Sequence, residues 1–211
     1  MKVFTDGSCI NNGKPNAIAG IGIYFGELDT RNVSSRIGGK QTNNTAELSA
    51  VIKVFDILRQ EIESKMDINI YTDSEYVRLC AGSYGAKSEL KDWKFPNGPK
   101  KGQFIPNHKL VEIIFNAFRD NSCVKLHHIK AHTGLQDELS IGNENADNLA
   151  NIAVGNSKQI KNNKIYINVP FAKKDVAKQY GAKWDKQKKS WYYTETTNKL
   201  CIQRLNELFK K

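Results

Sequence analysis

Alternating apolar and polar residues predict β-strands at five places in the first two thirds of the chain. Such alternation places successive side chains on opposite faces of a sheet, and a run rich in Gly and Asn separates the first two segments as a turn. The predicted strands are "KVFTD" (2–6), "AIAGIGIYFGE" (17–27), "RNVSSRIGG" (31–39), "DINIYTD" (67–73) and "CVKLHHIKA" (123–131).

Apolar residues spaced three or four apart predict helices between and after these strands. Either Asn43 or Asn44 is expected to cap the first of them. Because strands and helices are mixed, we expect one α/β domain over residues 1–157. The predicted helices are "TNNTAELSAVIKVFDILRQEIES" (42–64), a short one from Ser74, "PNHKLVEIIFNAFRD" (106–120) and "NENADNLANIAVG" (143–155).

The pattern breaks at the polar "GNSKQIKNNK", which predicts a linker over residues 158–163. A small α+β domain is expected after it, over residues 164–211. About 50 residues fold alone only marginally, so this domain is expected to lean on the first one or on a ligand. Its predicted elements are a strand in "KIYINVPF" (164–171), a helix in "AKKDVAKQYGA" (172–182), a strand in "KSWYYT" (189–194) and a helix in "TNKLCIQRLNELFKK" (197–211).

Composition describes a globular protein, with 39% apolar and 26% charged residues. No run approaches the roughly 18 apolar residues of a membrane span, and a strand begins at once, so neither a membrane segment nor a signal peptide is expected. The four cysteines lie far apart without a CxxC pair, which argues against a zinc site or disulfide framework. These features predict a reducing, intracellular location, cytoplasmic or nucleoid-associated, and a monomer.

The net charge of +10 is unevenly distributed. Positive and negative side chains cancel over residues 1–157, with 18 of each, whereas residues 158–211 carry 14 Lys/Arg and only 4 Asp/Glu. A surplus confined to the last quarter predicts a polyanionic partner, either nucleic acid or an anionic membrane surface.

Two predicted strands carry an aspartate among apolar residues, Asp6 in "VFTDGSC" and Asp73 in "IYTDSEYV". An unpaired carboxylate in such a setting costs several kcal/mol unless a partner or metal compensates it. Glu47, early in a helix, and Asp147, in the last helix of the first domain, are further candidates. Taken singly, each acid could be a turn, cap or solvated helix residue.

Taken together, four neighbouring carboxylates repel one another, and divalent cations relieve that repulsion. Ligands that are all oxygen favour Mg²⁺ or Mn²⁺ over zinc. Two such ions, roughly 3.5–4 Å apart, form the clamp used for phosphodiester cleavage.

The ordered set "TDGSC", "TNNTAEL", "YTDSEYV", "KAHTG" and "GNENADNLA" resembles the motifs of type 1 ribonuclease H, over about residues 1–155. The resemblance implies a mixed five-stranded sheet with helices on both faces. It also implies metal-dependent endonucleolytic cleavage of the RNA strand of an RNA–DNA hybrid, with two Mg²⁺ ions and 5′-phosphate and 3′-hydroxyl products. The residues matching the family's metal-binding acids are Asp6, Glu47, Asp73 and Asp147.

His132 in "KAHTG" matches the family's loop histidine, which is implied to assist proton transfer or product release. The stretch between His132 and Asp147 is several residues longer than in compact members. Glu144 within it either influences product release or is a solvated acid. His127 and His128 alternate within a strand and are expected to pack or to form hydrogen bonds.

The resemblance also implies contacts to both strands of the hybrid. Asn12, Asn43 and Asn44 resemble the family's hybrid-contacting residues, which are suited to sensing the RNA 2′-hydroxyl, and Cys9 and Glu75 lie beside them; alternatively, Asn12 and Asn43 simply support turns and caps. Donors for a DNA phosphate are Lys40, Thr42 and Asn107. The stretch 83–105 resembles the family's basic protrusion, where Trp93 could stack or pack into the core. The candidate protrusion contacts are Lys87, Lys91, Trp93, Lys94, Lys100 and Lys101.

Residues 164–200 resemble an uncharacterised module that occurs beside primases and other nucleic-acid enzymes, through "VPF", "DVAK", "GAKWD" and "SWYY". Lysines neutralise phosphates and aromatic faces accept bases, so this module is expected to tether the chain to duplex or single-stranded nucleic acid. Trp184 and Trp191 are expected in its core. The candidate contacts are Lys173, Lys174, Lys183, Lys188 and Lys189.

Three functions are compatible with these observations. The main one is a hybrid endoribonuclease, favoured by the four acids and by "KAHTG". The others are a hybrid-binding protein without catalysis, and a structure-specific DNase or strand-transfer nuclease of the same fold. Cleavage of hybrid, duplex DNA and duplex RNA distinguishes them.

Overall fold

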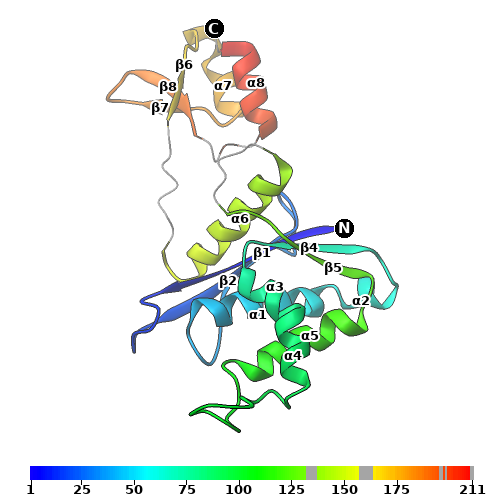
Figure 1. Cartoon of the computed structure of the whole chain (residues 1–211). Coiled ribbons are helices and arrows are strands. Elements are labelled where there is room, and N and C mark those ends of the chain that lie inside the picture. Colours follow the sequence, from blue (N-terminus) through cyan, green and yellow to red (C-terminus); the bar gives the residue numbers. More distant parts are fainter. Residues whose placement is uncertain (132–136, 157–163, 195–196, 198, 210–211) are drawn as a thin grey trace. The chain divides into compact units, whose positions relative to one another are not determined.

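A computed structural model describes residues 1–131, 137–156, 164–194, 197 and 199–209 (Figure 1). The chain divides into two compact units, Met1–Lys158 and Gln159–Lys211, each considered by itself below. The predicted linker, 158–163, lies outside the described residues. No helix in the described ranges is both long enough and apolar enough to cross a membrane.

The first unit contains a mixed five-stranded sheet, as predicted, and its strand order is β3-β2-β1-β4-β5. β1 pairs antiparallel with β2, and β2 antiparallel with β3, whereas β1–β4 and β4–β5 are parallel. The strands are β1 (Lys2–Ile10), β2 (Ile18–Tyr24), β3 (Val33–Arg36), β4 (Ile68–Thr72) and β5 (Val124–His128).

β1 is longer than predicted and does not end at Asp6. Residues 7–10 continue the strand because they pair in register with residues 18–21 of β2. The local sequence "GSCI" reads as the start of a turn, and the partner strand supplies the hydrogen bonds that keep it extended.

Helices cover both faces of this sheet (Figure 1). α6 lies on one face, and α1, α3, α4 and α5 lie on the other. The main core lies between the sheet and the helices α1, α3, α4 and α5. Its buried residues include Ile21, Val51, Ile70, Val77 and Ile114. The helices are α1 (Asn43–Ile57), α2 (Arg59–Glu63), α3 (Glu75–Ala81), α4 (Ser83–Glu89), α5 (His108–Asp120) and α6 (Glu138–Ala153).

Three helix predictions need correction. The single helix expected over 42–64 divides at Leu58 into α1 and α2. Its cap is Thr42, not an asparagine: the Thr42 hydroxyl accepts from the Thr45 amide at 3.2 Å, and the Thr45 hydroxyl accepts from the Thr42 amide at 3.1 Å. α6 begins at Glu138, before the predicted 143, because Asp137 caps it by accepting from the Ser140 amide at 2.9 Å.

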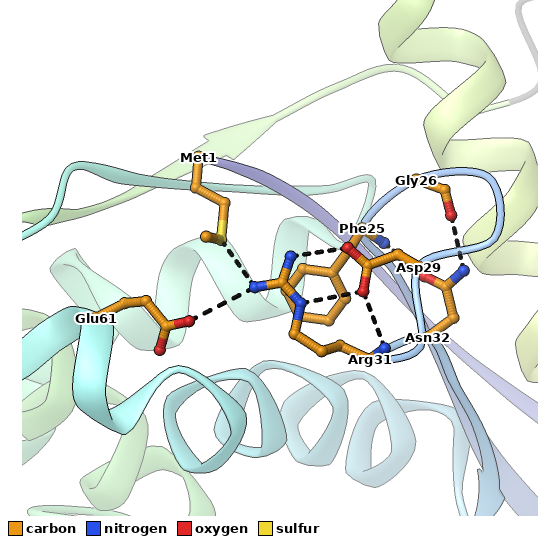
Figure 2. A network of polar contacts seen from close by, with 7 residues as sticks. All are labelled: Met1, Phe25, Gly26, Asp29, Arg31, Asn32 and Glu61. Carbon is orange, nitrogen blue, oxygen red and sulfur yellow. Dashed lines mark hydrogen bonds and ion pairs between the residues drawn. The ribbon is translucent and has the colours of Figure 1, made fainter.

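The loop between β2 and β3 is held by Arg31 (Figure 2). Its guanidinium donates to Asp29 at 2.7 Å, approaches Glu61 of α2 at 3.5 Å, and lies 4.6 Å from the centre of the Phe25 ring. The Asn32 side chain accepts from the Phe25 amide at 2.8 Å and donates to the Gly26 carbonyl at 2.8 Å. Hydrogen bonds from Arg31 lower the pKa of Asp29 to about 2.

The second unit has its own antiparallel sheet, in the order β6-β8-β7, and its own core. The core gathers Ile167, Ala177, Trp191, Tyr193 and Leu205. β7 was not predicted, because "KWD" has a single apolar residue between two charged ones and therefore shows no apolar alternation. The elements are β6 (Ile165–Ile167), η1 (Phe171–Lys173), α7 (Lys174–Gln179), β7 (Lys183–Asp185), β8 (Ser190–Tyr193) and α8 (Lys199–Phe209).

Candidate active site

Four elements of the first unit carry the four predicted acids. Asp6 lies within β1, Glu47 in the first turns of α1, and Asp73 directly after β4, while Asp147 is in α6. All four side chains are partly buried. Asp6 shares the α6 face of β1 with two neighbours along the strand: the Phe4 ring meets Gly142 of α6, and the Ser8 hydroxyl donates to Asn151 at 3.0 Å.

Two glycines let the helices approach the strands closely enough to bring these acids together. A Cβ added at Gly7 would lie 2.3 Å from the Glu47 amide nitrogen, and one added at Gly22 would lie 2.0 Å from the Ala146 carbonyl oxygen. Gly22 is the register partner of Asp6. The absence of a side chain at these two positions therefore lets the α1 backbone at Glu47 lie against β1 and the α6 backbone next to Asp147 lie against β2.

Asp6 is electrostatically coupled to each of the other three acids. The pKa of Asp6 is raised to about 8, first by burial and then by the negative charge of Asp73, with smaller contributions from Asp147 and Glu47. A hydrogen bond of 2.7 Å from the Gly7 amide opposes this shift. This cluster is therefore a place where negative charge is costly and a cation is favoured.

The pKa of Glu47 is also raised, by burial and by Asp73, while a hydrogen bond from Ser74 opposes the shift. The Ser74 hydroxyl donates to one Glu47 oxygen, and the Asn43 amide donates to the other at 2.7 Å. Both oxygens of this carboxylate are thereby held in one orientation.

Two asparagines of α6 hold the remaining aspartates. The Asn143 amide donates to Asp73 at 2.9 Å, and the Asn151 amide donates to Asp147 at 2.6 Å. Asn143 is buried and its side-chain oxygen has no hydrogen-bond partner in the described structure. Sequence reasoning missed both residues; the only signal for Asn151 was its i+4 spacing from Asp147 on a helix.

The donor set suits hard divalent cations, because it consists of carboxylate oxygens whose mutual repulsion a cation relieves. Among the described residues, no three His, Cys, Asp or Glu side chains already form a group that could hold a metal ion. The fit rests on the chemistry and coupling of Asp6, Glu47, Asp73 and Asp147.

The residues predicted to sense RNA lie in β1 and the turn after it, in α1, and at the start of α3. Asn12, in the turn after β1, and Asn44, in the first turn of α1, are exposed, whereas Cys9 is half-buried in β1. Asn43 is bonded to Glu47. Glu75, the first residue of α3, is exposed and accepts from Arg78 at 2.7 Å.

Of the three residues predicted to contact a DNA phosphate, two form side-chain hydrogen bonds within the protein. Lys40 is exposed, and Thr42 caps α1 through its hydroxyl. Asn107 adopts a left-handed conformation (φ 57°) before α5 and donates to the Tyr76 hydroxyl at 3.4 Å. Helix starts of this kind offer backbone donors suited to phosphate.

Both histidines of β5 were expected to pack or to form hydrogen bonds. His127 lies 2.7 Å from the Asn69 side-chain oxygen and stacks on Tyr71, and His128 lies 3.1 Å from the Asp73 carbonyl. Both form hydrogen bonds, which confirms the prediction. His132 lies outside the described residues.

The predicted basic protrusion consists of α4 and the loop after it. Trp93 is only 9% exposed and packs against Phe115, so it offers no stacking face; Phe104, 53% exposed beneath the Lys94 ammonium, is the accessible aromatic residue of this stretch. A hollow of about 230 Å³ is bordered by Lys87, Lys91 and Lys94. Lys100 and Lys101 are exposed.

The lysines predicted as contacts in the second unit are also accessible. Lys173, Lys183, Lys188 and Lys189 are exposed, and Lys174 is partly buried with its ammonium 4.2 Å from the Phe171 ring centre. Trp191 belongs to the core, as predicted. Trp184 does not: it is 47% exposed, because β7 is the edge strand and leaves one side of the ring uncovered.

The chain matches two family models, ribonuclease H over residues 1–155 and a domain of unknown function (DUF5710) over residues 164–204. It is 34% identical over 149 residues to the ribonuclease H of Schizosaccharomyces pombe, covering 70% of this chain and 50% of that protein. It is 30% identical to the ribonuclease H of Orientia tsutsugamushi, over 77% of this chain and 88% of that protein. The chain spans about half the length of its yeast and mammalian relatives.

Solved structures share the fold of the first unit. The RNase H domain of PFV superposes with a TM-score of 0.53 at 22% identity, over 73% of this chain and 93% of that one. A foamy viral protease–reverse transcriptase solved with an RNA/DNA hybrid gives a TM-score of 0.56 at 20% identity. The match covers 72% of this chain and 20% of that one. The fold, the converging acids and the match over residues 1–155 lead to one conclusion: the chain belongs to the ribonuclease H family.

Proposed function

We propose that this chain is an endoribonuclease that cleaves the RNA strand of an RNA–DNA hybrid and leaves 5′-phosphate and 3′-hydroxyl ends. The observation that carries the proposal is the group of four coupled carboxylates, in which the pKa of Asp6 rises to about 8. Such a group is unfavourable for stability and suited to divalent cations. The ribonucleases H among its relatives support the same activity.

Asp6, Glu47, Asp73 and Asp147 are the residues that would hold the metal, with Mg²⁺ the first candidate and two ions per site. When bound, such a pair of ions lowers the pKa of a water molecule and neutralises the leaving oxygen. The chain's own contribution is to orient the carboxylates. Asn143, Asn151 and Ser74 each donate to one of them, which limits their rotation.

Selectivity for RNA is assigned to the polar groups beside these acids. Asn12, in the turn after β1, and Asn44, in α1, are both exposed. Their side-chain amides suit this role, because an amide can both donate to and accept from a 2′-hydroxyl. Lys40, Thr42 and Asn107 are assigned to the phosphates of the DNA strand, which position the hybrid without reading its sequence.

The second unit is proposed to tether the enzyme to nucleic acid. Its exposed lysines would neutralise phosphates and raise the effective concentration of hybrid at the site. Binding through phosphates predicts a strong dependence on salt.

A cleavage assay with labelled substrates tests the proposed activity. RNA–DNA hybrid, duplex DNA and duplex RNA are each incubated with Mg²⁺, Mn²⁺ or EDTA. We expect cutting of the hybrid alone, only with metal, and none by Asp73→Asn. The control is Asp56→Asn, which removes an exposed acid of α1 paired with Lys53 at 3.6 Å and is expected to retain activity.

Each alternative has its own outcome in this assay. Binding of hybrid without cutting under any metal would refute catalysis and favour a binding protein. Cutting of duplex DNA would favour a DNase of the same fold.

A further inference from the structure

One face of the sheet in the second unit is not covered by that unit's core. Side chains alternate along β6 and β8, so that Ile167, Trp191 and Tyr193 point to the core while Tyr166 and Tyr192 point to the opposite face. Tyr166 and Tyr192 are register partners on neighbouring strands, and their ring centres lie 5.9 Å apart. They form an adjacent pair of half-buried rings.

Lysines surround this pair. The Lys164 ammonium lies 4.6 Å from the Tyr192 ring centre, and the Lys188 ammonium lies 4.6 Å from that of Tyr166. Lys183 of β7 is the register partner of Tyr192 and therefore shares its face. We call these five residues, Lys164, Tyr166, Lys183, Lys188 and Tyr192, the tyrosine–lysine face.

A buried carboxylate on the same side of the sheet organises the tyrosine–lysine face. The Asp185 side chain is only 8% exposed and accepts from the Lys164 ammonium at 2.7 Å and the Tyr166 hydroxyl at 2.8 Å. It also accepts from the backbone amides of Gln187 and Lys188, at 2.9 and 3.1 Å. Because this acid is satisfied from within, the face keeps fixed rings and presents positive charge.

Rings bordered by ammonium groups favour a ligand with both flat faces and phosphates, which is nucleic acid. A duplex keeps its bases stacked inside, so it would use the lysines and leave the rings without a partner. An unpaired strand uses both, because each base can stack on a ring while the lysines contact phosphates. Stacking of a base on an aromatic ring exceeds an exposed cation–π contact, so a base can displace the Lys188 ammonium from Tyr166 toward a phosphate, while Lys164 stays paired with Asp185.

We propose that the tyrosine–lysine face binds an unpaired stretch of the DNA strand that extends beyond the RNA–DNA hybrid. The proposal rests on the proposed function, because that function leaves the DNA strand intact. A tether on the RNA would be released with each cut, whereas a tether on the DNA holds the enzyme through successive cuts. The Tyr166 hydroxyl is engaged by Asp185 and is not available to read a 2′-hydroxyl, which agrees with a DNA ligand.

Binding is measured with the full chain carrying Asp73→Asn, so that the hybrid is not cut. Three hybrids share one duplex: blunt, with an overhang of about ten thymidines, or with an overhang of about ten uridines. The thymidine overhang is expected to lower Kd at least about fivefold relative to the blunt hybrid, and more than the uridine overhang does.

Tyr192→Leu removes the flat ring but keeps an apolar side chain suited to a strand. It is expected to abolish the advantage of the overhang, while Tyr192→Phe retains it and neither changes Kd for the blunt hybrid. Phe171→Leu is the matched control, because it removes another ring paired with a lysine in the same unit, 81% exposed and outside the sheet.

The proposal is overturned if the thymidine overhang gives no advantage, if uridines serve equally well, or if Tyr192→Leu binds like the parent chain. An equal loss in Phe171→Leu would likewise contradict the assignment to the sheet. Cleavage of blunt hybrid by the unsubstituted chain separately tests the proposed function, so the two failures are distinguishable.

Discussion

The sharpest prediction concerns the cost of charging Asp6. Its pKa is 3.8 in its ordinary state and about 8 in the fold, so the folded protein binds a proton that the unfolded chain releases between these values. A raised carboxyl pKa therefore makes the free energy of unfolding fall as pH rises from about 4 to 8. At pH 7 the shift sets a ceiling of about 4 kcal/mol on the stability lost.

Asp6→Asn removes this titration while keeping an oxygen that accepts from the Gly7 amide. In EDTA, the free energy of unfolding of the variant is expected to equal that of the parent near pH 4. At pH 8 it is expected to be larger than that of the parent by about 2–4 kcal/mol. In thermal unfolding this corresponds to a rise in Tm on the order of 10 °C for a domain of this size. Activity is expected to be lost, because a ligand of the proposed metal site is removed.

Urea and thermal unfolding at pH 4, 6 and 8, in EDTA and in Mg²⁺, measure these differences. Mg²⁺ is expected to stabilise the parent more than the variant, since the cation offsets a charge that only the parent carries. Asp56→Asn, which removes an exposed acid, controls for net charge. Equal stability of the Asp6 variant and parent at pH 8 in EDTA would refute the raised pKa of Asp6.

Four further predictions follow from other contacts. Gly7→Ala is expected to lower the free energy of unfolding by about 1–3 kcal/mol and to reduce cleavage, because α1 must move away from β1; urea unfolding and kcat measure this. Asn151→Ala is expected to raise the Mg²⁺ concentration for half-maximal activity about tenfold, and an unchanged value would exclude a role in holding its aspartate. Arg31→Ala is expected to lower the free energy of unfolding by about 1 kcal/mol at pH 7. Because the pKa of Asp29 is lowered to about 2 by Arg31, urea titrations should show this loss shrinking as pH falls from about 4 to 2. Deletion of residues 158–211 is expected to raise Kd for hybrid at moderate salt and flatten its salt dependence, with kcat unchanged; equal binding across a salt series would contradict the tether.

All five strands of the first unit were predictable from the sequence, because their periodicity is written within ten or so consecutive residues, whereas α4 and β7 were not predicted. The four acids were predicted as a set, since their motifs occur in a recognisable order, and their role stays a prediction. Asp6 illustrates the limit of this reasoning: the motif identified the residue, but the extension of β1 past it depends on pairing with β2. Pairing partners lie far away in sequence and leave no local signal.

What only the tertiary structure decided is burial and side-chain contact. The sequence treats Trp93 and Trp184 as similar aromatic residues among lysines, yet the first is covered by α5's Phe115 and the second remains open at an edge strand. Asn143 and Asn151 likewise became parts of the site only when α6 packed on β2 at Gly22. Composition and spacing determine which elements form, whereas the packing of distant segments determines which side chains meet, because those contacts depend on the whole fold.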